Sequence, residues 1–162
     1  MLLEVLESLS AKSRKSFSFA ILGQCRDGSD NLILKQLQKY VEVDFPDGFL
    51  ASDDFDSKGA SCHLLLAPLL SHMEYGTYKG TGAIGDAIYL RRNIILPAAC
   101  DPEGEFKEIA YCYSSKDDLI SFFNKLDVLA ERVVDSRFVE KFSTSNISSS
   151  IIEDLDLQGV HS

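Results

Sequence analysis

The chain has 162 residues, 45% of them hydrophobic and 25% charged, which is enough for one compact domain with a substantial core. Its net charge of −9 argues against nucleic acid as the main partner, because binding a phosphate backbone needs a basic face. The longest apolar runs are too short to span a bilayer, and the residues after Met1 lack the basic start of a signal peptide.

The first part of the chain alternates helix and strand patterns. Apolar residues from Leu2 to Leu9 repeat at the spacing of an amphipathic helix, and a polar connection, Ser10–Lys15, follows. The elements expected next are a buried strand at Phe17–Leu22 ending at Gly23, a loop and helix start at Gln24–Asp30, a helix at Ile33–Tyr40, a strand at Val41–Phe45 and a turn at Pro46–Gly48. Ser52 and the two aspartates after it predict a helix cap and an acidic first turn.

The second part begins with His63–Ala67, a nearly uniform apolar run that predicts a central parallel strand buried on both faces. The elements expected after it are a loop at Pro68–Lys79, a helix at Thr81–Arg92, a strand at Asn93–Leu96, a loop at Pro102–Lys107, a strand at Ile109–Tyr113 and a helix that runs from a capping box at Ser115 to Leu126. Further helix is predicted at Val128–Val134 and Ser136–Phe142, before an acidic tail.

Strands that alternate with helices predict an α/β fold, a Rossmann-like and mainly parallel sheet with helices on both faces. We expect residues 1–126 to form this core and residues 127–162 to form a C-terminal helical segment with a polar tail. Ligands of such sheets bind beyond the carboxyl ends of the strands.

The cysteines and histidines show no metal-site spacing. The four cysteines form no C-x-x-C pair, so we expect reduced, mostly buried thiols of a cytosolic protein; they are Cys25, Cys62, Cys100 and Cys112. His63 and His72 have no second ligand at metal spacing, so no metal role is assigned to either.

The stretch from Glu74 to Pro97 carries the strongest chemical signal. Lys79 and the turn Gly80-Thr81-Gly82 stand immediately before an apolar-periodic helix. A helix that begins with glycines and a hydroxyl presents free N–H groups and a positive dipole end, so this turn predicts a phosphate-binding site. The alternatives stay open: Lys79 as a solvated loop lysine, the glycines as an ordinary flexible helix entry, and Thr81 as a simple helix cap.

The ordered set of segments resembles the C-terminal, donor-binding domain of a GT-B glycosyltransferase of the retaining family-4 kind. The resemblance covers roughly Leu2–Leu126. It is carried by three segments in order, F-S-F-A-I-L-G at Phe17–Gly23, H-L-L-L-A-P-L at His63–Leu69 and D-A-I-Y-L-R-R-N-I-I-L-P at Asp86–Pro97. It implies half of a GT-B fold that binds a UDP- or GDP-sugar as donor for transfer to a sugar, lipid or glycan acceptor, with no prosthetic group.

The resemblance also implies roles for particular residues. Asp86 would accept hydrogen bonds from the ribose hydroxyls, because a carboxylate suits a vicinal diol. Lys79 with Gly80, Thr81 and Gly82 would hold the diphosphate, and Glu74 and Tyr75 would face the donor sugar, with an exposed loop as the alternative for this last pair. Glu74 is the weak candidate for a catalytic residue; no general base or nucleophile is evident.

The chain departs from the pattern of that family in two places. Tyr78 stands where the first glutamate of the E-x7-E motif is expected, with Asp86 at the second. The family's first strand, with its Gly-Arg…Lys-Gly segment, and its N-terminal acceptor domain have no counterpart here. We therefore expect an incomplete enzyme that is inactive alone. The alternative is a non-catalytic binding or assembly module, or a subunit of a split transferase, in which a partner chain or second copy completes the sheet. We expect a cytoplasmic location, either free or peripheral at the inner membrane surface.

Overall fold

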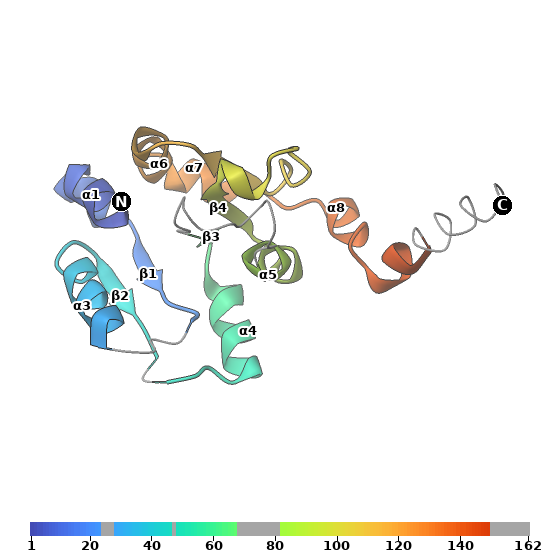
Figure 1. The fold of residues 1–162 in the computed structure, drawn as a ribbon, viewed down its shortest axis with the longest axis horizontal. Coiled ribbons are helices and arrows are strands. Elements are labelled where there is room, and N and C mark those ends of the chain that lie inside the picture. Colours follow the sequence, from blue (N-terminus) through green and yellow to red (C-terminus); the bar gives the residue numbers. More distant parts are fainter. Residues whose placement is uncertain (24–27, 47, 68–81, 150–162) are drawn as a thin grey trace.

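The computed structural model describes residues 1–23, 28–46, 48–67 and 82–149 (Figure 1). Helices and strands alternate along these residues, and every strand pairing among them is parallel. The chain is therefore an α/β protein with a Rossmann-like arrangement of parallel strands and flanking helices, as the sequence predicts.

The elements follow the predicted order with shorter strands. The helices are α1 (Leu2–Ser8), α2 (Ala11–Arg14), α3 (Gly28–Leu37), α4 (Ser52–Ser61), α5 (Gly82–Leu90), a 3-10 turn (Ala98–Cys100), α6 (Lys116–Phe123), α7 (Leu126–Glu131) and α8 (Ser136–Glu140). The strands are β1 (Ser18–Ala20), β2 (Glu42–Asp44), β3 (Leu64–Leu66), β4 (Asn93–Pro97) and β5 (Ala110–Tyr113).

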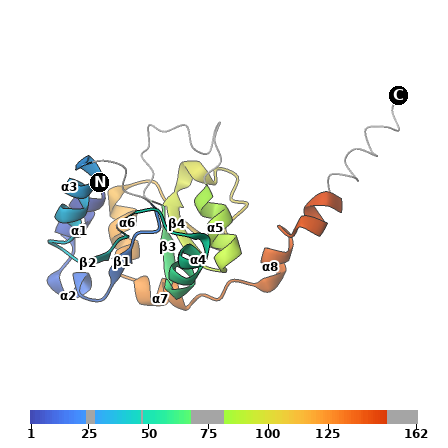
Figure 2. The same cartoon turned by 90° about the horizontal axis from the view of Figure 1, so that it is seen from below.

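The strands that the structure describes form two separate sheets. β1 pairs with β2, with Phe19 opposite Val43, while β4 lies between β3 and β5, with Ile95 opposite Leu66. Both Figure 1 and Figure 2 place β1 and β3 next to each other, at the facing edges of the two sheets. No hydrogen-bonded ladder joins those two strands among the described residues.

Successive residues of β4 enter two different hydrophobic clusters. Ile95 packs in the cluster that holds α1, the end of α3 and α6, and Ile94 and Leu96 pack in the cluster that holds α5 and α8. Because side chains alternate across a strand, these clusters lie on opposite faces of the sheet. The expectation of helices on both faces is confirmed.

The α1–α6 layer connects the two sheets on one face. Phe123 of α6 contacts Phe17 and Phe19 at β1, with ring centroids 5.1 and 6.1 Å apart. The same cluster contains Val43 of β2 and Ile95 of β4, so it spans both sheets. The sheets are thus held in one unit by side-chain packing rather than by a continuous ladder.

The capping box predicted at the start of α6 is confirmed. The Ser115 hydroxyl accepts a hydrogen bond from the Asp118 N–H at 3.1 Å, and the Asp118 carboxylate accepts one from the Ser115 N–H at 2.9 Å. This reciprocal pair satisfies orphan donors at the helix start and fixes where α6 begins.

Several local predictions are wrong. The polar connection Ser10–Lys15 contains a helical turn, α2, whose cap is the Ser10 side chain accepting from the Ser13 N–H. The cap of α4 is Ala51 rather than Ser52, although the acidic first turn is present. Cys112 is exposed rather than buried, although Ala110, two residues earlier on the same face of β5, is buried.

The prediction of a central strand at His63–Ala67 also fails in one respect. β3 forms there, but it lies at an edge of its sheet, and Leu64 and Leu66 are only half-buried. The physical reason is that a strand at the edge of a sheet is covered less completely than one that has a neighbour on each side, and among the described strands β3 pairs with β4 alone.

Candidate functional site

Five of the predicted site residues lie outside the described part of the chain. They are Glu74, Tyr75, Lys79, Gly80 and Thr81. The structure describes the remaining two, Gly82 and Asp86, which lie in the first turns of α5. The candidate site is therefore built from α5 and from the strands that lie near it.

Helix α5 is anchored by its apolar face. Ile84 and Ala87 are buried, at 8% and 0% exposure, in the cluster that contains Ile94 and Leu96 of β4. This spacing of apolar residues turns Asp86 toward the gap between the sheets, where it is half-buried. Gly82 is exposed, and a Cβ atom built there would meet nothing within 4 Å, so packing among the described residues does not require glycine at that position.

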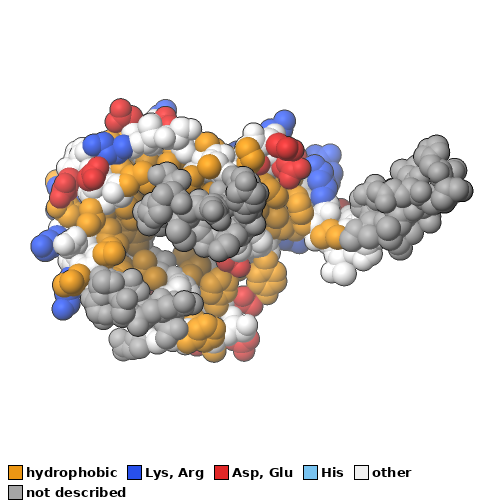
Figure 3. Space-filling model, viewed as in Figure 1, with side chains coloured by type: hydrophobic (Ala, Val, Ile, Leu, Met, Phe, Trp, Pro, Cys, Tyr) orange, Lys and Arg blue, Asp and Glu red, His pale blue; other side chains and the backbone are white. Residues whose placement is uncertain are grey.

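A cavity of about 1410 Å³ separates β1 from β3. Its walls are the two strands, with Phe19 and Ile21 on one side and Leu64–Leu66 on the other. Asp86 and Ala83 of α5 lie at its rim, as do Leu22 and Gly23, which follow β1. Hydrophobic side chains surround this hollow in Figure 3. The carboxyl end of β1 and the start of α5 thus open onto one space, where ligands of parallel sheets bind.

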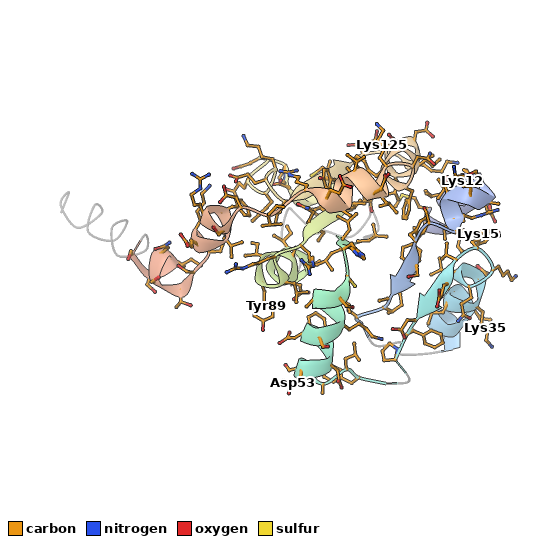
Figure 4. All side chains as sticks on the ribbon, turned by 180° about the vertical axis from the view of Figure 1, so that it is seen from behind. Lys12, Lys15, Lys35, Asp53, Tyr89 and Lys125 are labelled. Carbon is orange, nitrogen blue, oxygen red and sulfur yellow. The ribbon has the colours of Figure 1, made fainter. Side chains whose placement is uncertain are left out.

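The charged residues of this cavity are mostly acidic. Among the described residues that line it, Lys12 is the only lysine or arginine, whereas the carboxylates are Glu42, Asp44, Asp86, Asp127 and Glu131. Asp44 is paired with Lys58 at 2.8 Å. The other lysines labelled in Figure 4 (Lys15, Lys35 and Lys125) do not line the cavity and extend outward from the molecule.

The carboxylate of Asp86 has no hydrogen bond or ion pair with any residue that the structure describes, and burial raises its pKa above the ordinary value. A carboxylate in this state has its acceptor capacity free, because each oxygen can take hydrogen bonds from a ligand. Two neighbouring hydroxyls of a sugar are suitable donors. The described lining places no cation beside Asp86, so the positive groups for a diphosphate would have to come from elsewhere, such as the predicted Lys79.

Other residues of the cavity were missed by the sequence analysis. Gly23 was read only as the end of a strand, although it lies at the cavity rim. Asp127 and Glu131 were read only as part of a C-terminal helix, and both line the cavity from α7. Their spacing of four residues, which places two carboxylates on one helix face, is the signal that could have found them.

Comparison of the chain with models of known protein families, with curated proteins and with solved structures found no match. Within the described ranges, no helix combines the length and apolar character needed to cross a bilayer. The same residues contain no group of three or more His, Cys, Asp or Glu side chains placed to hold a metal ion.

Proposed function

We propose that this chain binds a sugar nucleotide, UDP- or GDP-linked, as the donor-binding domain of a cytoplasmic glycosyltransferase. The observation that carries the proposal is the position of Asp86, a half-buried carboxylate without a described partner, in the cavity that Gly23 also lines. A vicinal ribose diol can donate two hydrogen bonds to one carboxylate. The GT-B resemblance assigns Asp86 this same role.

In this proposal the chain holds the leaving group of the transfer. The bond between the sugar and the diphosphate breaks, and the acceptor hydroxyl oxygen bonds to the sugar carbon. The diphosphate leaves with the bonding electron pair and takes up the proton that the acceptor hydroxyl loses. The charge that develops on the diphosphate would be stabilised by Lys79, Gly80, Thr81 and Gly82. The rest of the rate enhancement would come from positioning the donor. The acceptor would be bound outside this chain, so we propose no turnover by the isolated protein.

The test is calorimetric titration of the chain with UDP and with GDP. We expect one of the two to bind, and Asp86→Asn to weaken that binding by at least tenfold, because hydrogen bonds to a charged group contribute about 1.5–3 kcal/mol. Asp117→Asn removes an exposed carboxylate from the first turn of α6, away from the cavity, and should leave affinity unchanged. Lys79→Ala tests the predicted diphosphate contact in the same way.

A ligand without the diol isolates the Asp86 contact. The 2′,3′-dideoxy form of the same nucleotide should bind the unaltered protein as weakly as the normal nucleotide binds Asp86→Asn, and Asp86→Asn should weaken it no further. Absence of binding by either nucleotide up to about 1 mM would contradict the proposal for the isolated chain. An equal effect of Asp86→Asn on both ligands would contradict the assignment of Asp86 to the ribose.

A further inference from the structure

The two facing strand edges at the cavity have unpaired backbone groups. Ile21 N–H donates to the Asp44 carbonyl at 2.8 Å, so Phe19 and Ile21 direct their backbone groups toward β2. The intervening residue, Ala20, therefore directs its N–H and C=O away from β2 and into the gap, as does Ser18.

The same reasoning applies to β3. Ala67 N–H donates to the Ile95 carbonyl at 2.9 Å, so Leu65 and Ala67 face β4. Leu64 and Leu66 then present their backbone groups to the gap. No described strand pairs with either of these two edges. Two strand edges, each with alternate N–H and C=O groups, thus face one space.

Side chains around the gap are apolar on both faces of the sheet. Phe19, Leu64 and Leu66 pack against the cluster of α1 and α6, and Leu65 belongs to the opposite cluster with Ile84 of α5. Neither β1 nor β3 carries a lysine, a proline or an inward-pointing charge, the features that usually protect an exposed edge. An occupant that fits this space must be apolar on both faces and must hydrogen-bond at both edges.

The gap is large enough for one strand. A five-residue strand about 16 Å long, 4.8 Å wide and 10 Å thick fills roughly 800 Å³, and two strands fill roughly 1600 Å³. The cavity volume of about 1410 Å³ lies between these values, and it includes the open rim at α5.

We propose that the gap between β1 and β3 is the binding site for an extended segment of another polypeptide, four or five residues long, apolar on both faces and flanked by lysine or arginine. Its backbone would pair with Ser18 and Ala20 on one edge and with Leu64 and Leu66 on the other, which would join the two sheets into one. The mode is addition of a β-strand.

The carboxylates that line the gap favour a segment with basic ends. Asp127 and Glu131 line the cavity from α7, which lies with α2 at one side of the molecule in Figure 2, and Asp86 lines it from α5. These three carboxylates have no ion-pair partner among the described residues, so basic residues at the ends of the inserted segment would be attracted to them. A second copy of the chain is disfavoured as donor of the strand, because its net charge is also −9 and each described strand of it is already paired.

The test uses synthetic peptides and amide hydrogen exchange. The basic peptide KKVTIVIKK should bind the full chain at one to one in calorimetry and slow exchange of the Ala20 and Leu66 amides by at least tenfold. The amide of Ile94 already donates to the Ile109 carbonyl and serves as the internal control, which should change little. A central proline in the peptide (KKVTPVIKK) removes a donor and should weaken binding at least tenfold. Acidic flanks (EEVTIVIEE) should weaken it by a similar factor in low salt, with the difference shrinking as salt is raised.

A protein variant tests the β3 edge directly. Leu66→Pro removes an N–H that faces the gap and leaves the hydrogen bonds to β4 in place, whereas Leu66→Ala keeps that N–H. Peptide binding should be lost in the first variant and reduced less in the second. If Leu66→Pro does not fold, the proline peptide decides the question on the unaltered protein. Equal binding of KKVTIVIKK and KKVTPVIKK, protection confined to residues outside β1 and β3, or no binding up to about 1 mM would each overturn the proposal. Protected Ala20 and Leu66 amides without any peptide would do so too, since they would mean that the gap closes by itself.

This inference does not depend on the sugar-nucleotide proposal. The peptide would occupy the length of the gap and the nucleotide its rim, and both ligands would use Asp86, so each is titrated alone. Nucleotide titration without peptide and peptide titration without nucleotide therefore fail or succeed separately.

Discussion

β3 and β4 are neighbours with similar composition and different burial. β3 is three leucines, of which only Leu65 is buried, at 8% exposure. In β4 all of Asn93–Leu96 are buried, and Ile94 is fully enclosed. β4 has a strand on each side and β3 has one side open to the cavity.

This difference shows that an apolar strand sequence favours burial, but that the neighbouring strands determine how much of its apolar area is removed from water. The hydrophobic free energy scales with the apolar area removed from water, so β3 contributes less per residue than β4 in this structure. The apolar area that stays exposed at β3 and β1 is the driving force for filling the gap between them.

The largest expected effect comes from removing the side chain that covers the first sheet. Phe123→Ala deletes a ring that contacts Phe17 and Phe19 and is 3% exposed, and we expect a loss of about 3–5 kcal/mol in the free energy of unfolding. Urea unfolding followed by circular dichroism measures it. Phe49→Ala, at a ring that is 84% exposed, is the matched control and should change stability by less than about 0.5 kcal/mol. A loss below about 1 kcal/mol for Phe123→Ala would mean that the α1–α6 layer does not hold β1.

The second-largest effect is the difference in stability loss between truncating a side chain in β4 and truncating one in β3. Ile95→Ala, at a residue 1% exposed, should cost about 3 kcal/mol, and Leu66→Ala at the half-buried edge should cost about 1 kcal/mol. The same urea experiment on both variants measures the difference. With a strand peptide bound in the gap, the cost of Leu66→Ala should rise toward that of Ile95→Ala. Equal costs without peptide would show that β3 is already enclosed.

A smaller effect is expected at the start of α6, the helix that spans both sheets. Ser115→Ala removes the hydroxyl that accepts from the Asp118 N–H, and loss of such a cap costs about 1 kcal/mol. Ser114→Ala is the control, because the Ser114 contact to Asp118 is made by its backbone N–H. Thermal unfolding of the unaltered protein and of the two variants measures the stability change that each substitution causes. If Ser114→Ala is as costly as Ser115→Ala, the capping box is not the source of the stability.

The smallest effect is the pH dependence of the same cap. Hydrogen bonds from the Ser114 N–H, then from Ser115, hold the pKa of Asp118 below its ordinary value. A depressed pKa means that the folded state favours the carboxylate, so this contribution is present above the ordinary Asp pKa of about 3.9 and is lost as the pH falls through the lower folded value. The stability difference between the unaltered protein and Asp118→Asn should therefore be largest near neutral pH and disappear in strong acid, as acid and urea titrations would show. A stability difference between the unaltered protein and Asp118→Asn that stays constant from neutral pH to strong acid would contradict the assignment.

Much of the fold could be predicted from local sequence patterns. The periodicity of Leu2–Leu9 predicted α1, the S-x-x-D spacing at Ser115 predicted the start of α6, and the apolar run before Pro97 predicted β4. These signals act within a few residues, where side-chain period and capping chemistry decide the structure. α2 was missed because a single helical turn has no repeat to detect and depends on one Ser10 hydrogen bond.

The candidate site was predicted in part. Asp86 was selected from the sequence, and the structure places it at the rim of the cavity. The predicted phosphate-binding site around Lys79 lies outside the described residues and stays a prediction. Gly23 and Glu131 could not be associated with Asp86 from sequence, because the packing of α5 and α7 against separate strands brings them to one cavity.

The sequence by itself determined an acidic α/β chain, the order of its helices and strands, and which residues seek burial, because these follow from charge, side-chain period and local hydrogen bonds. Only the tertiary structure decided that the described strands form two sheets rather than one, and that β1 and β3 face each other across a cavity. The reason is that strand pairing joins residues distant in sequence, and an open backbone edge is visible only once every neighbouring strand has been placed.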